Sequence, residues 1–156
     1  MTLNDPNASL EAARRQLAMR APAMSLEEYA EALARVETEI VPRLDPAARE
    51  AVTAELRDLL LFQAFSLGDP SWERLLRERV RDGWPDARQR AHVLFVTLLY
   101  LTRQQAVDQV AELRGWIVDC LRELRAEEPD APLSNYARAM EAAGLPLPPD
   151  LVDEDT

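Results

Sequence analysis

Apolar residues recur at intervals of three and four along most of the chain, which is the spacing of one face of an α-helix. Between Ser25 and Pro42 a single stripe of this kind is formed by Leu26, Tyr29, Leu33, Val36 and Ile40. Ser25 and Glu28 have the spacing of a capping box, in which each side chain accepts a hydrogen bond from the other residue's amide. The pattern predicts a helix from about residue 26 to residue 40.

Proline and glycine mark the ends of the next two helices. Asp45-Pro46 provides a cap followed by a proline at the first helical position, which predicts a helix that runs to about Leu67 and ends at Gly68. We expect this helix and the preceding one to form a hairpin that turns near residue 43. A shorter helix, expected between residues 70 and 83, has an apolar stripe of Trp72, Leu75, Leu76 and Val80.

No proline interrupts residues 86–128, and one apolar stripe keeps its phase through them. Its members are Phe95, Leu98, Ala106, Val110, Leu113, Ile117, Leu121 and Leu124. The stripe predicts either one helix of ~63 Å, at ~1.5 Å per residue, or two helices that break at Thr102-Arg103-Gln104-Gln105, which has a capping-box pattern. A last short helix is expected over residues 134–143.

These segments predict an all-α fold, a single-domain helical bundle of five or six helices over residues 1–156. The bundle would contain the early hairpin and a long C-terminal helix or helix pair, with residues 91–101 at its centre. A chain of 156 residues is long enough to bury a core without a disulfide or a metal ion. Residues 1–8 and the acidic, proline-rich residues 145–156 are expected to form irregular tails.

The amino-acid composition limits the kinds of binding partner and the cellular location that we expect. The net charge of −10 and the pI of about 4.6 disfavour binding to phosphate backbones, so we expect no nucleic-acid partner. With only Cys120 and His92, one chain cannot form an internal disulfide or a Cys/His zinc site, which fits a cytoplasmic protein. The longest apolar stretch, residues 91–101, is shorter than the ~20 residues that span a bilayer, so we expect no membrane segment.

Most catalytic arrangements are missing from the sequence. The four glycines are too sparse for a phosphate-binding loop, and none of the five serines lies in a G-x-S-x-G motif. We interpret His92 and Cys120 as structural residues. The helix expected between residues 70 and 83 carries Arg74, Arg77 and Arg81. Glutamates lie three or four residues from these arginines, and we expect the arginines to pair with them. Carboxylates are then the remaining candidates for chemistry.

Two carboxylates, Glu55 and Asp58, interrupt the apolar run AELRDLLLFQAF at residues 54–65. Among apolar neighbours a carboxylate loses hydration, so it should be neutral, paired with arginine or bound to a metal ion. The hairpin would place Glu31 level with Glu55, and Glu28 level with Asp58. Four carboxylates at one height form the oxygen-rich ligand set that Mg²⁺ or Mn²⁺ prefers.

The spacing of Glu28, Glu31, Glu55 and Asp58 resembles the E-x-x-E…E-x-x-D signature of the MazG-type all-α nucleotide pyrophosphatases, over residues 25–67 only. The resemblance implies that these four side chains hold magnesium, which would orient a nucleoside triphosphate for attack by water and release of pyrophosphate. Enzymes of this family often carry a lysine and an asparagine on a later helix. This chain departs from that pattern, because it has no lysine and Asn135 is its only asparagine beyond the first ten residues.

The interpretation that we favour is not catalytic. Glu55 and Asp58 would pair with arginines of packed helices, such as Arg90 or Arg103, and fix their register. The protein would then be a small acidic cytoplasmic interaction protein, either an adaptor, a chaperone-like partner or an inhibitor of a basic target, or else a structural subunit. A stripe sustained over residues 95–124 is longer than one neighbouring helix can cover, which predicts a protein partner or a homodimer through this segment.

Overall fold

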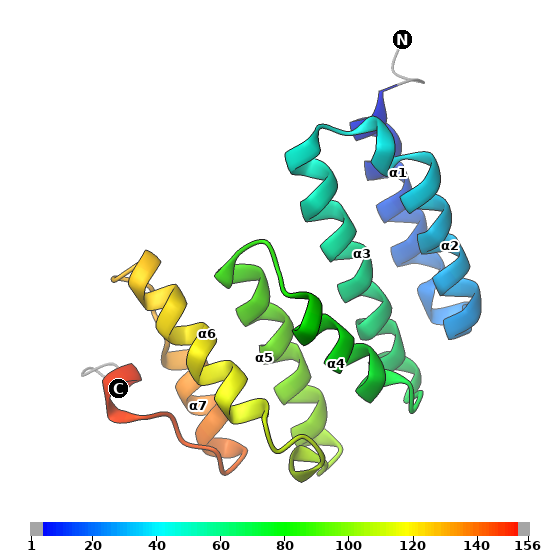
Figure 1. Ribbon diagram of the computed structural model, residues 1–156. Coiled ribbons are helices and arrows are strands. Elements are labelled where there is room, and N and C mark those ends of the chain that lie inside the picture. Colours follow the sequence, from blue (N-terminus) through cyan, green and yellow to red (C-terminus); the bar gives the residue numbers. More distant parts are fainter. Residues whose placement is uncertain (1–4, 153–156) are drawn as a thin grey trace. The chain divides into compact units, whose positions relative to one another are not determined.

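The computed structural model describes residues 5–152, and within them the chain forms seven α-helices and no β-strand (Figure 1). The helices are α1 (Pro6–Arg20), α2 (Leu26–Glu39), α3 (Pro46–Leu67), α4 (Trp72–Asp82), α5 (Ala87–Arg103), α6 (Leu113–Glu127) and α7 (Ser134–Ala142). The predicted all-α class is confirmed, with more helices than the five or six expected. The chain divides into two compact units, Met1–Pro85 and Asp86–Thr156. A single domain over residues 1–156 stays a prediction.

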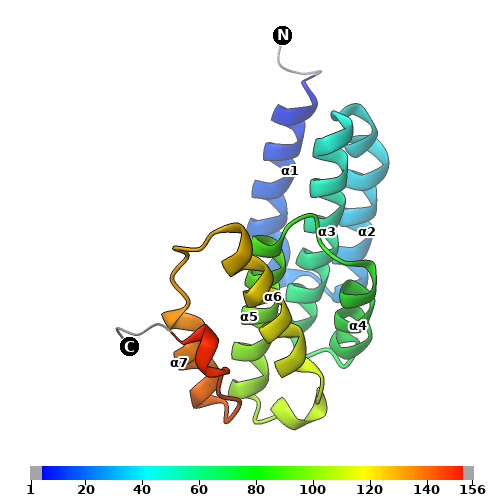
Figure 2. The same cartoon turned by 60° about the vertical axis from the view of Figure 1, so that its left-hand side comes forward.

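The first unit begins with three helices that lie side by side (Figures 1 and 2). The capping box predicted for α2 is present, because Ser25 Oγ accepts from the Glu28 amide at 3.1 Å and Glu28 Oε1 accepts from the Ser25 amide at 3.1 Å. The chain turns through Val41–Arg43, and Pro46 then occupies the first position of α3. Local sequence therefore sets both ends of the connection between α2 and α3.

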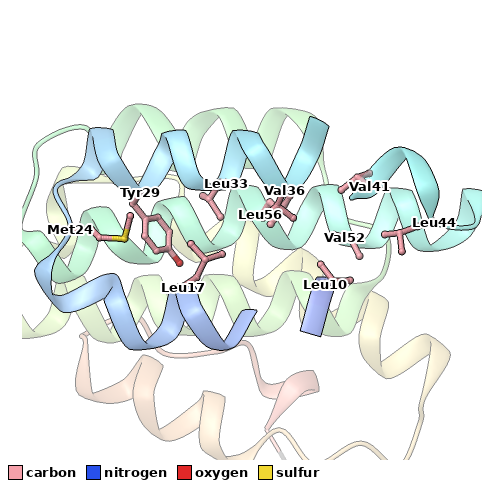
Figure 3. Close-up of a cluster of buried hydrophobic side chains, with 10 residues drawn as sticks. All are labelled: Leu10, Leu17, Met24, Tyr29, Leu33, Val36, Val41, Leu44, Val52 and Leu56. Carbon is pink, nitrogen blue, oxygen red and sulfur yellow. The ribbon is translucent and has the colours of Figure 1, made fainter. Parts of the chain in front are cut away.

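The core of the first unit lies between α1, α2 and α3. It consists of Leu10, Leu17, Met24, Tyr29, Leu33, Val36, Val41, Leu44, Val52 and Leu56 (Figure 3). Three of these residues belong to the stripe predicted for α2, and they point from α2 toward α1 and α3. Burying such side chains supplies the main favourable free energy for packing the three helices together.

Helix α4 packs against α3 after a sharp change of direction. Gly68 ends α3 in the left-handed conformation at φ 64°, which glycine adopts without strain. The ring centroids of Phe65 and Trp72, on either side of the turn, lie 6.0 Å apart. The buried side chains of α4 are Trp72, Leu75, Leu76 and Arg79. An arginine thus continues the buried face of this helix, and its partner is described below.

The long segment 86–128 forms two helices, α5 and α6, rather than one. Helix α5 ends in a Schellman motif, in which Gln105 has φ 55°, its amide donates to Thr102 O and the Ala106 amide donates to Leu101 O. Thr102 is not an N-cap. It lies inside α5, where its hydroxyl donates to Leu98 O, and α6 begins only at Leu113. The break falls where the sequence allowed one, but the predicted capping box does not form.

The break lets α5 and α6 fold onto each other within the second unit (Figures 1 and 2). Of the predicted stripe, the buried members are Leu98, Val110, Leu113, Ile117, Leu121 and Leu124. Helix α7 also packs on α5, where the rings of Phe95 and Tyr136 meet edge to face at 5.1 Å. The chain itself covers most of the face that was expected to need a partner, so a homodimer through residues 95–124 no longer follows from the length of the stripe.

The two predicted tails are more ordered than expected. Helix α1 begins at Pro6, inside the predicted tail 1–8, and Asp5 Oδ1 caps it by accepting from the Asn7 amide at 3.0 Å. In the C-terminal segment Leu147 and Leu151 are buried, and Pro149–Leu151 form a short 3₁₀ turn. Residues 1–4 and 153–156 lie outside the described part of the chain. None of the helices between residues 5 and 152 has the length and apolar character needed to cross a bilayer.

Adjacent leucines of α5 test the packing of the second unit. Leu98 is 1% exposed and Leu99 is 43% exposed. Leu98→Ala should lower the free energy of unfolding by about 2–5 kcal/mol, because it removes buried apolar surface and leaves a cavity. Leu99→Ala, which removes the same atoms, should change it by less than about 1 kcal/mol. Urea unfolding followed by circular dichroism measures both values, and equal losses would contradict this packing.

Candidate functional site

Glu55 forms a two-point ion pair with an arginine of α1. Arg14 Nε donates to Glu55 Oε2 at 2.8 Å, and Arg14 Nη2 donates to Glu55 Oε1 at 2.6 Å. The hydrogen bond to Glu55 raises the pKa of Arg14. Both side chains stay partly in solvent, at 39% exposed for Arg14 and 33% for Glu55. The pair therefore joins α1 to α3 at the margin of the core, where water screens the charges.

Asp58 lies in a drier environment, three residues further along α3. It is 4% exposed, and its partner Arg79, from α4, is 3% exposed. Arg79 Nε donates to Asp58 Oδ1 at 2.8 Å, and the indole Nε1 of Trp84 donates to the same oxygen at 2.9 Å. The guanidinium carbon of Arg79 lies 4.9 Å from the centroid of the Trp84 ring, a cation–π distance. Three side chains thus form one cluster, Asp58–Arg79–Trp84, in which Asp58 and Arg79 are buried and Trp84 is partly exposed.

Arginine pairing of Glu55 and Asp58 was predicted, but the arginines named for it were wrong. Neither Arg90 nor Arg103 is the partner seen here. Arg90 Nη1 instead donates to Glu123 Oε2 at 3.2 Å, across α5 and α6. Sequence periodicity could have identified Arg79, because it lies three and four residues after the buried Leu76 and Leu75 and so continues their face. No comparable signal identifies Arg14, since α1 has a weak apolar pattern.

The other two carboxylates of the predicted metal set lie on α2. Glu28 closes the capping box, and the hydrogen bond from the Ser25 amide lowers the pKa of its carboxyl. Glu31 is exposed. Across residues 5–152, no three side chains of His, Cys, Asp or Glu are grouped so that they could hold a metal ion. The magnesium site at Glu28, Glu31, Glu55 and Asp58 stays a prediction that rests on the sequence resemblance.

An open groove of about 590 Å³ lies beside the Asp58–Arg79–Trp84 cluster. One wall is a face of α3, and the other is the end of α4 with the turn that follows it. The lining residues are Pro46, Arg49, Glu50, Thr53, Ala54, Arg57, Arg79, Asp82, Gly83, Trp84 and Pro85. Gly83 has φ 79°, a backbone conformation that glycine adopts without strain. The turn at Gly83 places the ring of Trp84 over the guanidinium of Arg79. Sequence reasoning did not predict this groove.

The remaining candidates have structural contacts. Cys120 is fully buried in α6, where its thiol donates to Ala87 O at 3.3 Å, and burial raises its pKa to about 11. This agrees with its interpretation as a core residue. On α4, Arg74 pairs with Glu78 at 3.0 Å and Arg77 pairs with Glu73 at 3.9 Å, as predicted. Arg81 pairs with its neighbour Asp82. His92 is exposed on α5.

Comparison of the chain with models of protein families, with curated proteins and with solved structures gave no match. The functional argument therefore depends on the contacts of these side chains alone.

The two ion pairs of α3 should differ in their effect on stability. Asp58→Asn leaves the buried Arg79 without a counter-charge and should lower the free energy of unfolding by about 3–5 kcal/mol. Glu55→Gln should lower it by only about 1 kcal/mol, because both members of that pair are a third or more exposed. The apolar neighbours of Glu55 in the sequence predict a buried pair and a loss of about 3–5 kcal/mol for Glu55→Gln. The partial exposure of Glu55 and Arg14 lowers that expected loss. Urea unfolding of the two variants measures the difference, and a larger loss for Glu55→Gln would contradict the assignment.

Cys120 should be unreactive in the folded protein. A thiol with a pKa of about 11 has little thiolate at pH 8, and the buried position also blocks access of the reagent. A disulfide reagent such as DTNB should therefore modify the native chain slowly at pH 8 and the urea-unfolded chain at once. Fast, complete modification under native conditions would show that the thiol is accessible.

Proposed function

We propose that this chain is a small acidic interaction protein of the cytoplasm that binds a basic partner, as an adaptor, a chaperone-like partner or an inhibitor. The observation that carries the proposal is the pairing of Glu55 with Arg14 and of Asp58 with Arg79. Glu55 and Asp58 are the carboxylates that the sequence marked as the best candidates for chemistry, and both lie in ion pairs that join two helices. They stabilise the first unit, and the exposed charges remain for recognition.

Helix α2 carries the surface that we favour for the partner. Its exposed acidic residues are Glu27, Glu28, Glu31, Glu37 and Glu39, and Arg35 is the one basic residue between Leu26 and Glu39. The buried side chains of this helix face the core of the first unit, and the helical spacing places Glu27 and Glu31 on the opposite side. Glu37 lies at the margin, 3.6 Å from Arg57 of α3. A helix face with this charge attracts a basic surface and speeds encounter with it.

Self-association through residues 95–124 is another form of the proposal. Leu99 is among the exposed large apolar residues, and Trp116 is partly exposed on α6. Because the stripe itself is covered, a dimer would use these side chains rather than the buried leucines. Sedimentation equilibrium measures the mass of the protein in solution. Twice the mass of one chain would show that the partner is a second copy, and the mass of one chain would exclude a homodimer.

The pyrophosphatase alternative requires Glu55 and Asp58 to leave their arginines and bind magnesium. Asp58 is buried against Arg79 and Trp84, so releasing it would leave a charged guanidinium without its partner. We therefore place this function second. Release of pyrophosphate from a nucleoside triphosphate, dependent on Mg²⁺ and lost in Glu55→Gln, would overturn the order of the two proposals.

Charge reversal on α2 tests the interaction proposal. Tagged protein is used to capture partners from an extract of the native host, and the captured proteins are identified by mass spectrometry. The Glu27→Lys/Glu31→Lys variant changes two exposed residues one turn apart, so the fold should be retained. We expect it to lose a basic partner that the original chain captures, with at least about a tenfold loss of affinity.

The matched control is Asp130→Lys/Glu141→Lys, which changes two exposed residues of the second unit and alters the net charge equally. It should keep the partner, because recognition depends on the local face of α2. Equal loss in both variants would mean that only net charge matters, and retention of the partner by Glu27→Lys/Glu31→Lys would remove α2 as the binding surface.

A further inference from the structure

The groove beside α4 contains a buried cationic donor without a partner. Arg79 uses Nε on Asp58 and stacks against the Trp84 ring, but its Nη2 is buried and makes no hydrogen bond. A buried charged donor left without an acceptor destabilises the fold, because it has lost its hydration and gained no hydrogen bond in return. Such a group in a cleft is usually explained by a role or by a bound molecule.

Other hydrogen-bond donors line the same groove. Thr53 and Arg57 are one turn apart on the α3 wall, and both line the groove with Arg79. Arg57 is half exposed and lies 3.6 Å from Glu37, a distance that leaves its guanidinium available to a stronger acceptor. Arg49 lies a further turn toward the start of α3, with its Nε on Leu44 O at 2.8 Å. One wall of the groove therefore presents a row of hydroxyl and guanidinium groups.

We propose that this groove binds a small molecule through an oxyanion, a phosphate or a carboxylate, held by Arg57 and Arg79 with the Thr53 hydroxyl. A planar guanidinium binds such groups through paired hydrogen bonds, which supplies the acceptor that Nη2 lacks. The groove volume of about 590 Å³ is within the range of small-molecule sites. This site is formed by α3, α4 and the turn that follows α4, and it does not depend on the interaction proposal, although Arg57 also lies 3.6 Å from Glu37 of α2.

Two carboxylates also line the groove and set where the anion binds. Glu50 and Asp82 are exposed, and Asp82 already accepts from Arg81 Nε at 3.2 Å. Water screens these exposed carboxylates, whereas Asp58 already balances the charge of the buried Arg79. Arg79 therefore offers an oxyanion its Nη2 donor, and Arg57 adds a guanidinium charge. The oxyanion should therefore bind at the buried Nη2 of Arg79 rather than beside the exposed Glu50 and Asp82.

Access to Arg79 is controlled by Trp84. The indole covers the guanidinium and is held by its hydrogen bond to Asp58 and by the Gly83 turn. Since Nη2 is buried in the structure, an oxyanion reaches it as the indole shifts. Binding should therefore change the environment of Trp84 and leave those of Trp72 and Trp116 unchanged.

The test is ¹⁹F nuclear magnetic resonance of the full chain labelled with 5-fluorotryptophan, with the three signals assigned by single Trp→Phe variants. Phosphate, pyrophosphate and citrate are titrated separately to about 10 mM at constant ionic strength, with chloride as the reference. We expect a saturable shift of the Trp84 signal alone. Saturation by phosphate or pyrophosphate identifies a phosphate site, and saturation by citrate alone identifies a carboxylate site.

Two arginine variants locate the site. Arg57→Gln removes a groove guanidinium from an exposed position and should raise the dissociation constant about tenfold. Arg74→Gln removes an arginine of α4 that does not line the groove and should leave the constant unchanged. The proposal fails if no oxyanion gives a saturable shift of Trp84, if chloride gives the same shift, or if Arg57→Gln binds as well as the original chain.

Discussion

The buried ion pair of Asp58 and Arg79 constrains how α4 packs on α3 in the first unit. Removing two charges from water costs several kcal/mol each, and their attraction offsets that cost only with good geometry and further hydrogen bonds. Trp84 supplies one of these bonds and stacks on the guanidinium. The short hydrogen bond joins fixed positions of α3 and α4, and together with the Gly68 turn it specifies the register of the two helices.

The two carboxylates of α3 show how position on a helix changes the role of similar side chains. Glu55 and Asp58 are less than one turn apart, yet Glu55 faces α1 at the margin of the core and Asp58 faces α4 inside it. The first pair is screened by water and contributes little, while breaking the second strands a buried charge. A short polar pattern in an apolar run thus indicates a contact between helices as readily as a metal site.

Much of the fold follows from local sequence, and the contacts between helices do not. The capping box at Ser25 and the proline at position 46 set helix starts within a residue of those observed. Asp5-Pro6 carries the same signal, and it marks the start of α1. The end of α5 depends on Gln105 in a left-handed conformation, which sequence seldom reveals because glycine usually occupies such positions. The spacing of α4 indicates that Arg79 is buried, but its pairing with Asp58, like that of Arg14 with Glu55, depends on how the helices pack.

The central claim is that Asp58 and Arg79 act as a structural pair. A double-mutant cycle with Asp58→Leu, Arg79→Met and the combined variant, followed by urea unfolding, tests it most directly. Each single change strands a buried charge, whereas the double change leaves an apolar pair of similar size. We expect the double variant to be more stable than the sum of the single losses implies, with a coupling energy of at least about 2 kcal/mol. Additive losses would contradict the account.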